Sequence, residues 1–194
     1  MSTTYLMLIL TITSVWLFFK NVNEKQKPSV LAWSIITITT AISLFSFLSN
    51  LDEMREENIV RGVLFFANSG ASAIILARLL YLGGYNLKLT TFDKFSAVVT
   101  VGILIYWFQF NNPFVANLCT QGLMVISYLL ILKRVFETKG KSDNHWFWLC
   151  AVGMSGLSFV SINDGGQLLE TVNTWRSIIS TGSVLSLIYF FKLR

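Results

Sequence analysis

Three side-chain amides stand in stretches of this sequence that are otherwise apolar: Asn68, Asn117 and Gln121. An amide that finds no hydrogen-bond partner in such surroundings costs several kcal/mol, so each of them needs a polar group beside it. That group is either part of a neighbouring helix or a solute in a water-filled pocket, and the sequence leaves both alternatives open. Asn117 and Gln121 are four residues apart, which places both amides on one face of a helix. The chemistry that these residues could do is the binding of a small polar solute by hydrogen bonds.

Groups that could make or break covalent bonds are scarce. The chain has one histidine, His145, and nothing in it resembles a hydrolytic triad. Its two cysteines, Cys119 and Cys150, both fall inside apolar stretches, so neither a disulfide nor a zinc site is indicated. We therefore predict that the protein is not an enzyme and that it holds no metal and no other cofactor.

The elements that must position these amides are membrane-spanning helices. Apolar residues make up 54% of the chain and charged residues 13%, about half of what a soluble domain uses to cover its surface. The apolar runs are continuous, and each is close to the roughly 20 residues that a helix needs to cross a hydrocarbon core. The predicted fold is therefore all-α and integral to a membrane, with seven transmembrane helices. The predicted spans are 4–20, 29–49, 60–82, 93–110, 113–135, 146–162 and 175–192.

Basic residues are distributed unevenly between the predicted loops. Twelve of the fifteen lysines and arginines fall on the side that holds the C-terminus, and three fall on the other side. Cytoplasmic loops carry such an excess, so the sequence predicts an external N-terminus and a cytoplasmic C-terminus. The compact chain and its short loops favour a bacterial plasma membrane, and an organelle membrane stays open. The net charge of +5 follows from the same asymmetry, so nucleic-acid binding is not indicated.

Arg61 and Arg176 stand at the predicted outer starts of the third and seventh spans. On one interpretation they anchor these helices at the interface or pair with nearby glutamates. On the other they flank an outer vestibule, where they attract an anionic substrate or form a gate. No charge, these two included, is predicted deeper than about two turns from an interface. The sequence therefore favours an uncharged solute, and a facilitator over a proton-coupled pump.

The sequence also contains an internal repeat, whose two copies have the same orientation. With a shift of 113 positions, residues 12–50 align without a gap on residues 125–163, and Trp33 then pairs with Trp146. A shift larger by two residues pairs Arg61 with Arg176. Two three-helix units in the same orientation need one extra crossing between them. We therefore predict a first three-helix repeat at 1–82, a linker with the fourth helix at 83–112, and a second three-helix repeat at 113–194.

This plan of three helices, one linker helix and three more helices resembles the SWEET sugar transporters and the wider PQ-loop superfamily. That superfamily includes vitamin transporters of the PnuC type and the KDEL receptor. The resemblance covers the whole chain at the level of topology. The Pro-Gln pair of PQ-loop proteins is absent, because the only prolines are Pro28 and Pro113. The resemblance implies two parallel three-helix repeats with a solute site between them.

The resemblance also implies roles for particular residues. In SWEET proteins an asparagine of the third helix and its repeat partner in the seventh contact the substrate. Asn68 and its repeat partner, Ser183, are therefore implied to bind the substrate. Asn117, Gln121 and Tyr128 of the fifth span are further candidates for substrate binding. Arg61 and Arg176 are the candidates for an outer gate or vestibule.

Taken together, these features predict a small membrane transporter or facilitator that works by alternating access. Its expected cargo is a small polar, mostly uncharged solute, such as a vitamin, a nucleoside or a sugar. The expected partners are that solute and the lipid bilayer, with no nucleic acid, and a homo-oligomer stays open. Two other functions stay open as well: a seven-helix receptor or sensor, and a non-transporting subunit of a membrane complex.

Overall fold

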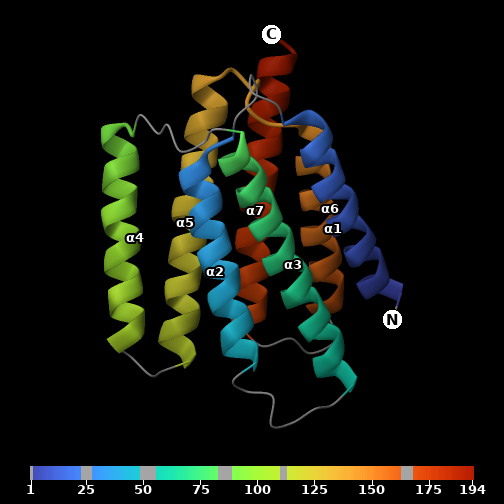
Figure 1. The fold of residues 1–194 in the computed structure, drawn as a ribbon. Coiled ribbons are helices and arrows are strands. Elements are labelled where there is room, and N and C mark those ends of the chain that lie inside the picture. The colour runs from blue at the N-terminus through green and yellow to red at the C-terminus, as the bar shows by residue number, and fades with distance from the viewer. Residues whose placement is uncertain (1, 23–27, 49–55, 83–88, 110–112, 163–167) are drawn as a thin grey trace.

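The computed structural model describes residues 2–22, 28–48, 56–82, 89–109, 113–162 and 168–194 (Figure 1). These residues form seven helices and no strand, which confirms the predicted all-α fold with seven helices. The helices are α1 (Ser2–Asn21), α2 (Val30–Leu48), α3 (Glu56–Tyr81), α4 (Thr91–Gln109), α5 (Pro113–Glu137), α6 (His145–Ile162) and α7 (Leu168–Lys192). Successive helices run in opposite directions, so the two ends of the chain lie at opposite ends of the bundle (Figure 1).

Helix α7 begins earlier than the apolar pattern predicts, at Leu168 rather than at residue 175. Its first turns contain Glu170, Thr171 and Asn173, which lower the hydropathy of the segment but are compatible with a helix. Arg176 therefore does not stand at the first turn of this helix, and its predicted place at the outer start of the seventh membrane span stays a prediction. Arg176 is the ninth residue of α7, about 12 Å along the axis from its first residue.

Polar side chains fix the starts of α2 and α6. Ser29 Oγ accepts the backbone N–H of Ala32 at 3.2 Å, and Asn144 Oδ1 accepts that of Trp146 at 2.9 Å. Each bond satisfies a donor that the first turn of a helix leaves without an intrahelical partner. The starts of the two helices, Val30 and His145, are 115 residues apart, two more than the shift that aligns the sequence without a gap.

This longer shift changes which tryptophans are equivalent. Trp33 is 5% exposed, and Trp148, which lies 115 residues further on, is 2% exposed. Trp146, the partner that the ungapped alignment predicts for Trp33, is 54% exposed. The pairing of Trp33 with Trp146 is therefore not the one that burial supports, because the starts of α2 and α6 are 115 rather than 113 residues apart.

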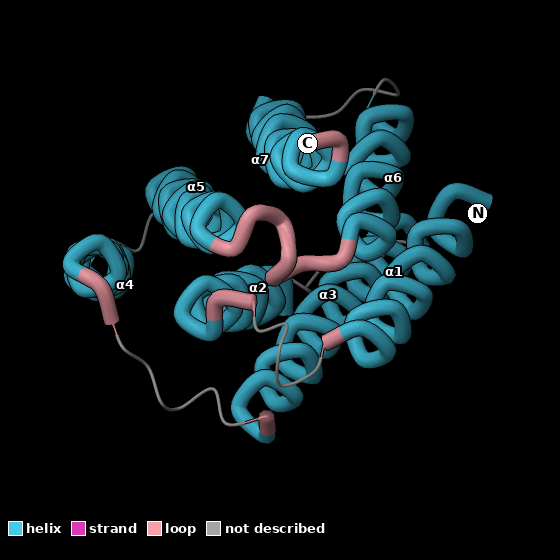
Figure 2. Tube along the Cα trace, turned by 90° about the horizontal axis from the view of Figure 1, so that it is seen from above, coloured by secondary structure: helices cyan, strands magenta, loops and turns pink. Residues whose placement is uncertain are grey.

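The helices form two triplets that have the same internal order. In the first triplet, α1–α3, helix α3 contacts both α1 and α2, and in the second triplet, α5–α7, helix α7 contacts both α5 and α6. Among the described residues, the backbones of α1 and α2 are not adjacent, and neither are those of α5 and α6; only rings near the C-terminal end meet between them. The triplets meet through two helix pairs, α1 with α6 and α2 with α5 (Figure 2).

Helix α4 stands at the edge of the molecule beside α5, with a smaller contact to α2 (Figure 2). Its first turn is held by Asp93, whose Oδ2 accepts the backbone N–H of Thr90 at 2.8 Å. Lys133 of α5 donates to Asp93 Oδ1 at 2.9 Å and also bonds the hydroxyl of Thr90. This ion pair fastens α4 to α5 at the end of the bundle that carries the C-terminus.

Two helical stretches in the described residues are long and apolar enough to cross a membrane, by length and composition alone. They are Thr91–Gln109, with a hydropathy of 1.3, and Leu118–Glu137, with a hydropathy of 1.4. Shorter apolar stretches lie at Tyr5–Lys20 and Val30–Phe45. In these terms α4 and most of α5 are candidates for transmembrane helices.

The buried apolar cluster of the protein lies mostly toward the C-terminal end of the bundle. Its centre is formed by the rings of Phe18, Trp33 and Phe147, which come from α1, α2 and α6. Their centroids are 5.6, 5.7 and 5.8 Å apart in edge-to-face geometry, an arrangement that adds to the gain from burial. These three rings, which we call the aromatic plug, join the two triplets at this end.

We predict that Phe147→Ala destabilises the protein far more than Trp146→Ala does. Phe147 is 7% exposed and belongs to the aromatic plug, so its loss should cost about 3–5 kcal/mol. The neighbouring Trp146 faces outward, and its loss should cost about 0.5 kcal/mol or less. Unfolding of the purified variants, followed by tryptophan fluorescence, measures both. Equal losses for the two variants would contradict the packing described here.

Candidate solute-binding site

Two of the residues singled out by the sequence, Gln121 and Arg176, meet between α5 and α7, and a third, Tyr128, lies two turns further along the same face of α5. The Arg176 guanidinium donates from Nε to Gln121 Oε1 and from Nη2 to Asn173 Oδ1, the latter at 2.5 Å. Tyr128 lies within electrostatic range of the same guanidinium. We call Gln121, Tyr128, Asn173 and Arg176 the α5–α7 site.

The α5–α7 site lies inside the helical bundle rather than at its end. Gln121 is the ninth residue of α5, Arg176 is the ninth residue of α7, and the two helices run in the same direction (Figure 1). Gln121 also falls within the apolar stretch Leu118–Glu137. The two side chains therefore meet at one level, about 12 Å from the first residue of each helix.

The environment of Arg176 differs from one edge of its guanidinium to the other. The bond from Nη2 to Asn173 is exposed, whereas Nη1 is buried and has no hydrogen-bond partner. Among the side chains that the structure describes, the other charges belong to residues near the C-terminal end of the bundle. Arg176 lies about two turns from the start of α7, and the expectation that no charge lies deeper than about two turns from a membrane interface stays a prediction.

Asn68 and Ser183, the implied pair of substrate contacts, are both exposed but do not lie on equivalent faces of their helices. Asn68 shares one face of α3 with Ser72, Ile75 and Leu79, which are 3%, 2% and 1% exposed. That face is therefore covered from Ser72 toward the C-terminal end and uncovered at Asn68. Asn68 thus marks where the inner face of the first triplet becomes accessible from the N-terminal end.

The buried face of α7 has the same spacing but a different register. Thr181, Val184 and Ile188 are 2%, 0% and 2% exposed, and they repeat the spacing of Ser72, Ile75 and Leu79 at a shift of 109 residues. In this register the counterpart of Asn68 is Ser177. Ser183 lies instead seven residues from Arg176, on the same side of α7 as that arginine.

Hydroxyl pairs join the helices within each triplet. The hydroxyls of Thr40 and Ser72 are 2.9 Å apart between α2 and α3, and those of Ser155 and Ser177 are 2.7 Å apart between α6 and α7. Three of these four hydroxyls also lie within hydrogen-bond distance of a backbone carbonyl three or four residues earlier in their own helix. Ser72, for example, is 2.9 Å from Ser69 O. Small hydroxyl residues let helix backbones approach closely while their polar atoms stay satisfied. Each triplet is therefore a tightly joined unit.

The C-terminal side of the α5–α7 site is closed by aromatic rings. Tyr128 packs against Trp148 with centroids 6.1 Å apart, and Trp148 packs against Phe147 of the aromatic plug at 5.2 Å. The Trp148 indole donates from Nε1 to Asp143 Oδ1 at 3.3 Å, and Ser142 donates to Asp143 Oδ2 at 2.8 Å. Tyr128 of the α5–α7 site is thus connected through Trp148 to the carboxylate of Asp143 in the loop between α5 and α6.

Asp143 lies in that loop, between the end of α5 and the start of α6. The removal of water from around its carboxyl raises the pKa of Asp143 to about 6. The hydrogen bonds from Ser142 and Trp148 and the charge of Arg134 act in the opposite direction and limit the rise. A carboxyl in this state changes its protonation within a unit or so of neutral pH.

Two predicted site residues and several unforeseen ones complete the inventory. Arg61 and Asn117 lie in α3 and α5, but their side chains fall outside the described part of the structure. Sequence reasoning missed Asn173, because it precedes the predicted start of the last span. It also missed Asp143, which looks like an ordinary solvated loop residue. The available signal was Trp148, because a residue in the first turn of α6 can reach back to the loop that precedes the helix.

No known protein family matches this chain. Comparison with models of protein families, with curated proteins and with solved structures found nothing similar. The resemblance to SWEET and PQ-loop proteins is one of topology and stays a prediction. Any assignment of function to this chain has to come from its own geometry.

The raised pKa of Asp143 predicts a pH dependence of stability with a definite sign. The folded protein holds this proton more tightly than the unfolded chain does, so stability is highest below about pH 4 and falls as the pH rises to about 6. The melting temperature of the wild type, relative to that of Asp143→Asn at each pH, should fall by a few degrees across this window. A difference that is constant with pH, or that grows, would contradict the assignment.

Proposed function

We propose that the protein is an integral membrane transporter in which the two triplets rock against each other and expose a site between them to either side of the membrane in turn. The first support is the polarity of α4, which is the reverse of that of a soluble helix. Its buried residues are Ser96 and Thr100, while Phe95, Val98 and Phe108 are 66%, 71% and 76% exposed. Such a helix is favourable where the surroundings are lipid.

The same reversal holds for the molecule as a whole. Among the side chains that the structure describes, thirty-two large apolar ones are exposed, against eighteen hydrophobic ones that are buried. The buried polar residues in the same part of the chain are all serines and threonines. Soluble monomers rarely expose contiguous apolar patches above a few hundred Å², whereas small hydroxyl residues inside and large apolar residues outside are typical of helices packed in a bilayer.

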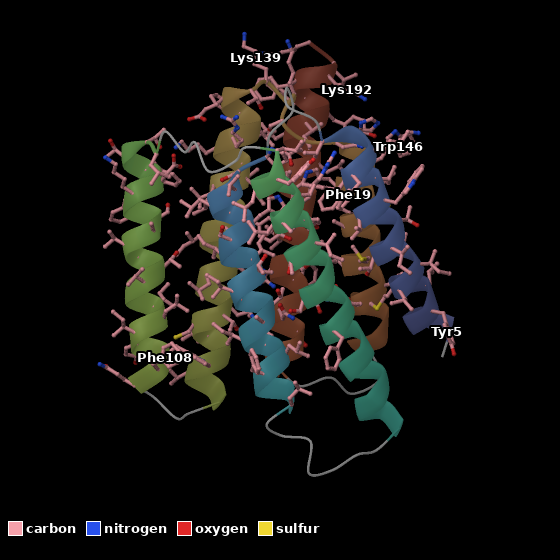
Figure 3. The ribbon with its side chains drawn as sticks, viewed as in Figure 1. Tyr5, Phe19, Phe108, Lys139, Trp146 and Lys192 are labelled. Carbon is pink, nitrogen blue, oxygen red and sulfur yellow. The ribbon has the colours of Figure 1, made fainter. Side chains whose placement is uncertain are left out.

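Aromatic and basic residues support a position across the membrane with the C-terminus in the cytoplasm. The outward-facing rings of Tyr5 and Phe108 lie toward one end of the bundle, and Phe19 and Trp146 lie toward the other (Figure 3). Lys139 lies beyond the second group, at the C-terminal end, as does Lys192 (Figure 3). Aromatic girdles flanked by lysines on the cytoplasmic side are the pattern that orients membrane proteins.

The observation that carries the transport proposal is the contact pattern of the two triplets. Each is joined internally by a central helix and by hydroxyl pairs, and the triplets meet along two further helix pairs, α1 with α6 and α2 with α5. Two like units related in this way are the usual framework of alternating access. The aromatic plug fills the C-terminal end of the bundle, which on this proposal corresponds to a conformation closed toward the cytoplasm.

The predicted orientation is tested by thiol labelling in intact bacterial cells. In a background with Cys119 and Cys150 replaced by alanine, Gln109→Cys should react with a membrane-impermeant maleimide. Lys139→Cys should react only after the membrane is permeabilised, because it lies at the opposite, cytoplasmic end. Labelling in the reverse order would contradict the orientation. Recovery of the protein in the soluble fraction would contradict the membrane assignment.

Rocking of the triplets is tested by cross-links within and between them. Thr11 Oγ1 donates to Met154 Sδ at 3.2 Å between α1 and α6, so Thr11→Cys/Met154→Cys joined by a short thiol cross-linker ties the two triplets together. Solute flux into proteoliposomes should then stop and return on reduction. The matched pair Thr40→Cys/Ser72→Cys, which lies within the first triplet, should leave most of the flux intact. Unchanged flux in the first pair would rule out this mechanism.

A further inference from the structure

We propose that Arg176 is the recognition point for the solute, and that the solute is a small monocarboxylate rather than a neutral molecule. This inference rests on the transport function proposed above and names the class of its cargo. A carboxylate oxygen would take the place that Asn173 Oδ1 now holds on Nη2, and the second oxygen would bind Nη1. Two parallel N–H···O bonds along one edge of a guanidinium are the preferred geometry of such pairs.

The geometry of the guanidinium makes this edge the one that a ligand would use. Gln121 already occupies Nε from α5, on the side that faces the neighbouring helix. The bond from Nη2 to Asn173 is exposed, so an incoming ligand can exchange with that amide at little cost. Nη1 is buried beside it and lacks a partner, which leaves a donor of a charged group unsatisfied until an acceptor arrives. Asn173 thus stands in for an oxygen of the ligand.

The charge of the site sets the charge of the ligand. Among the described residues, Asp93 and Glu137 pair with Lys133, and no carboxylate is paired with Arg176. One guanidinium with one monocarboxylate gives a neutral pair, and a neutral pair is far less costly to enclose between apolar helices than either ion alone. A dianion would leave one negative charge uncompensated at the same level. Tyr128 stands within electrostatic range and offers a neutral hydroxyl to the rest of the solute.

The structure also explains how the site holds its arginine without an internal carboxylate. Gln121 is a neutral isostere of glutamate, so it positions the guanidinium through Nε and leaves its charge free for a ligand. Gln121→Glu would supply that negative charge from within the protein. The variant therefore competes with the proposed ligand while it keeps the shape of the site.

The test is thermal unfolding of the purified protein in detergent with three monocarboxylates, each beside its neutral amide. The pairs are lactate with lactamide, benzoate with benzamide, and nicotinate with nicotinamide. Sodium chloride is replaced by the sodium salt at constant ionic strength, so that any shift is measured against chloride. At a concentration about 100-fold above Kd, a ligand that binds only the folded state raises the melting temperature by several degrees. At least one carboxylate should do so, and its amide should not.

Three variants connect this shift to Arg176. Arg176→Gln and Gln121→Glu should each lower the affinity for the carboxylate by roughly 100-fold, because each removes the uncompensated charge. Arg176→Lys should lower it by about tenfold, since an ammonium keeps the charge but loses the planar fork. Arg78→Gln is the control, because it changes the net charge equally at the C-terminal end of the bundle and should bind as the wild type does. The Arg176→Gln substitution removes the buried donor Nη1 that lacks a partner. Without ligand, this variant should therefore melt no lower than the wild type.

The outcomes separate this inference from the transport proposal. If none of the carboxylates stabilises the wild type above chloride, or if Arg176→Gln and Arg78→Gln bind alike, the carboxylate assignment is overturned. If an amide stabilises the protein as well as its acid does, the cargo is neutral and transport by alternating access still stands. If flux into proteoliposomes is insensitive to the cross-link between the triplets, the transport mechanism fails, whatever Arg176 binds.

Discussion

A positive charge held inside an apolar bundle is the constraint on which the rest of this structure depends. Arg176 sits about 12 Å into α7, where it is held by Gln121 from α5 and by Asn173 from its own helix. An uncompensated guanidinium in such a place is costly, so its retention indicates a use. The neutral partners that surround it orient the charge without cancelling it. Buried apolar residues of α5 and α7 belong to the same cluster, and the hydrogen bond between Arg176 and Gln121 adds a polar link between the two helices.

In the remainder of the bundle, most of the polar groups at the helix contacts are small hydroxyls. Serine and threonine hydroxyls line the helix contacts and bond either to their own helix or to one another. Close packing through these residues makes each triplet a firm unit, while large apolar side chains cover the outside. The two units are joined along α1 with α6 and along α2 with α5, and by the aromatic plug at the C-terminal end. A rocking mechanism requires that motion between the units cost less than motion within them.

Much of the fold could be predicted from the sequence, because apolar runs of about 20 residues with polar breaks specify helices directly. The exception was the start of α7, where Glu170 and Asn173 interrupt the apolar pattern without interrupting the helix. That boundary concealed that Arg176 lies about two turns inside α7 rather than in its first turn. The repeat registers also differ between helix pairs, since insertions in loops shift them. An alignment by residue identity therefore paired Trp33 with Trp146, where burial pairs it with Trp148.

The candidate site was predictable only in part, because the sequence of a helix does not specify which residues of another helix lie beside it. Gln121 and Tyr128 share a face of α5, but nothing in the sequence places Arg176 against them. The central claim is that the two triplets open at alternate ends. The most direct measurement is the distance between spin labels at Tyr81→Cys and Trp146→Cys, exposed positions on different triplets at the C-terminal end. Rocking predicts two distance populations whose ratio changes with a stabilising solute, whereas one population that no solute alters would contradict it.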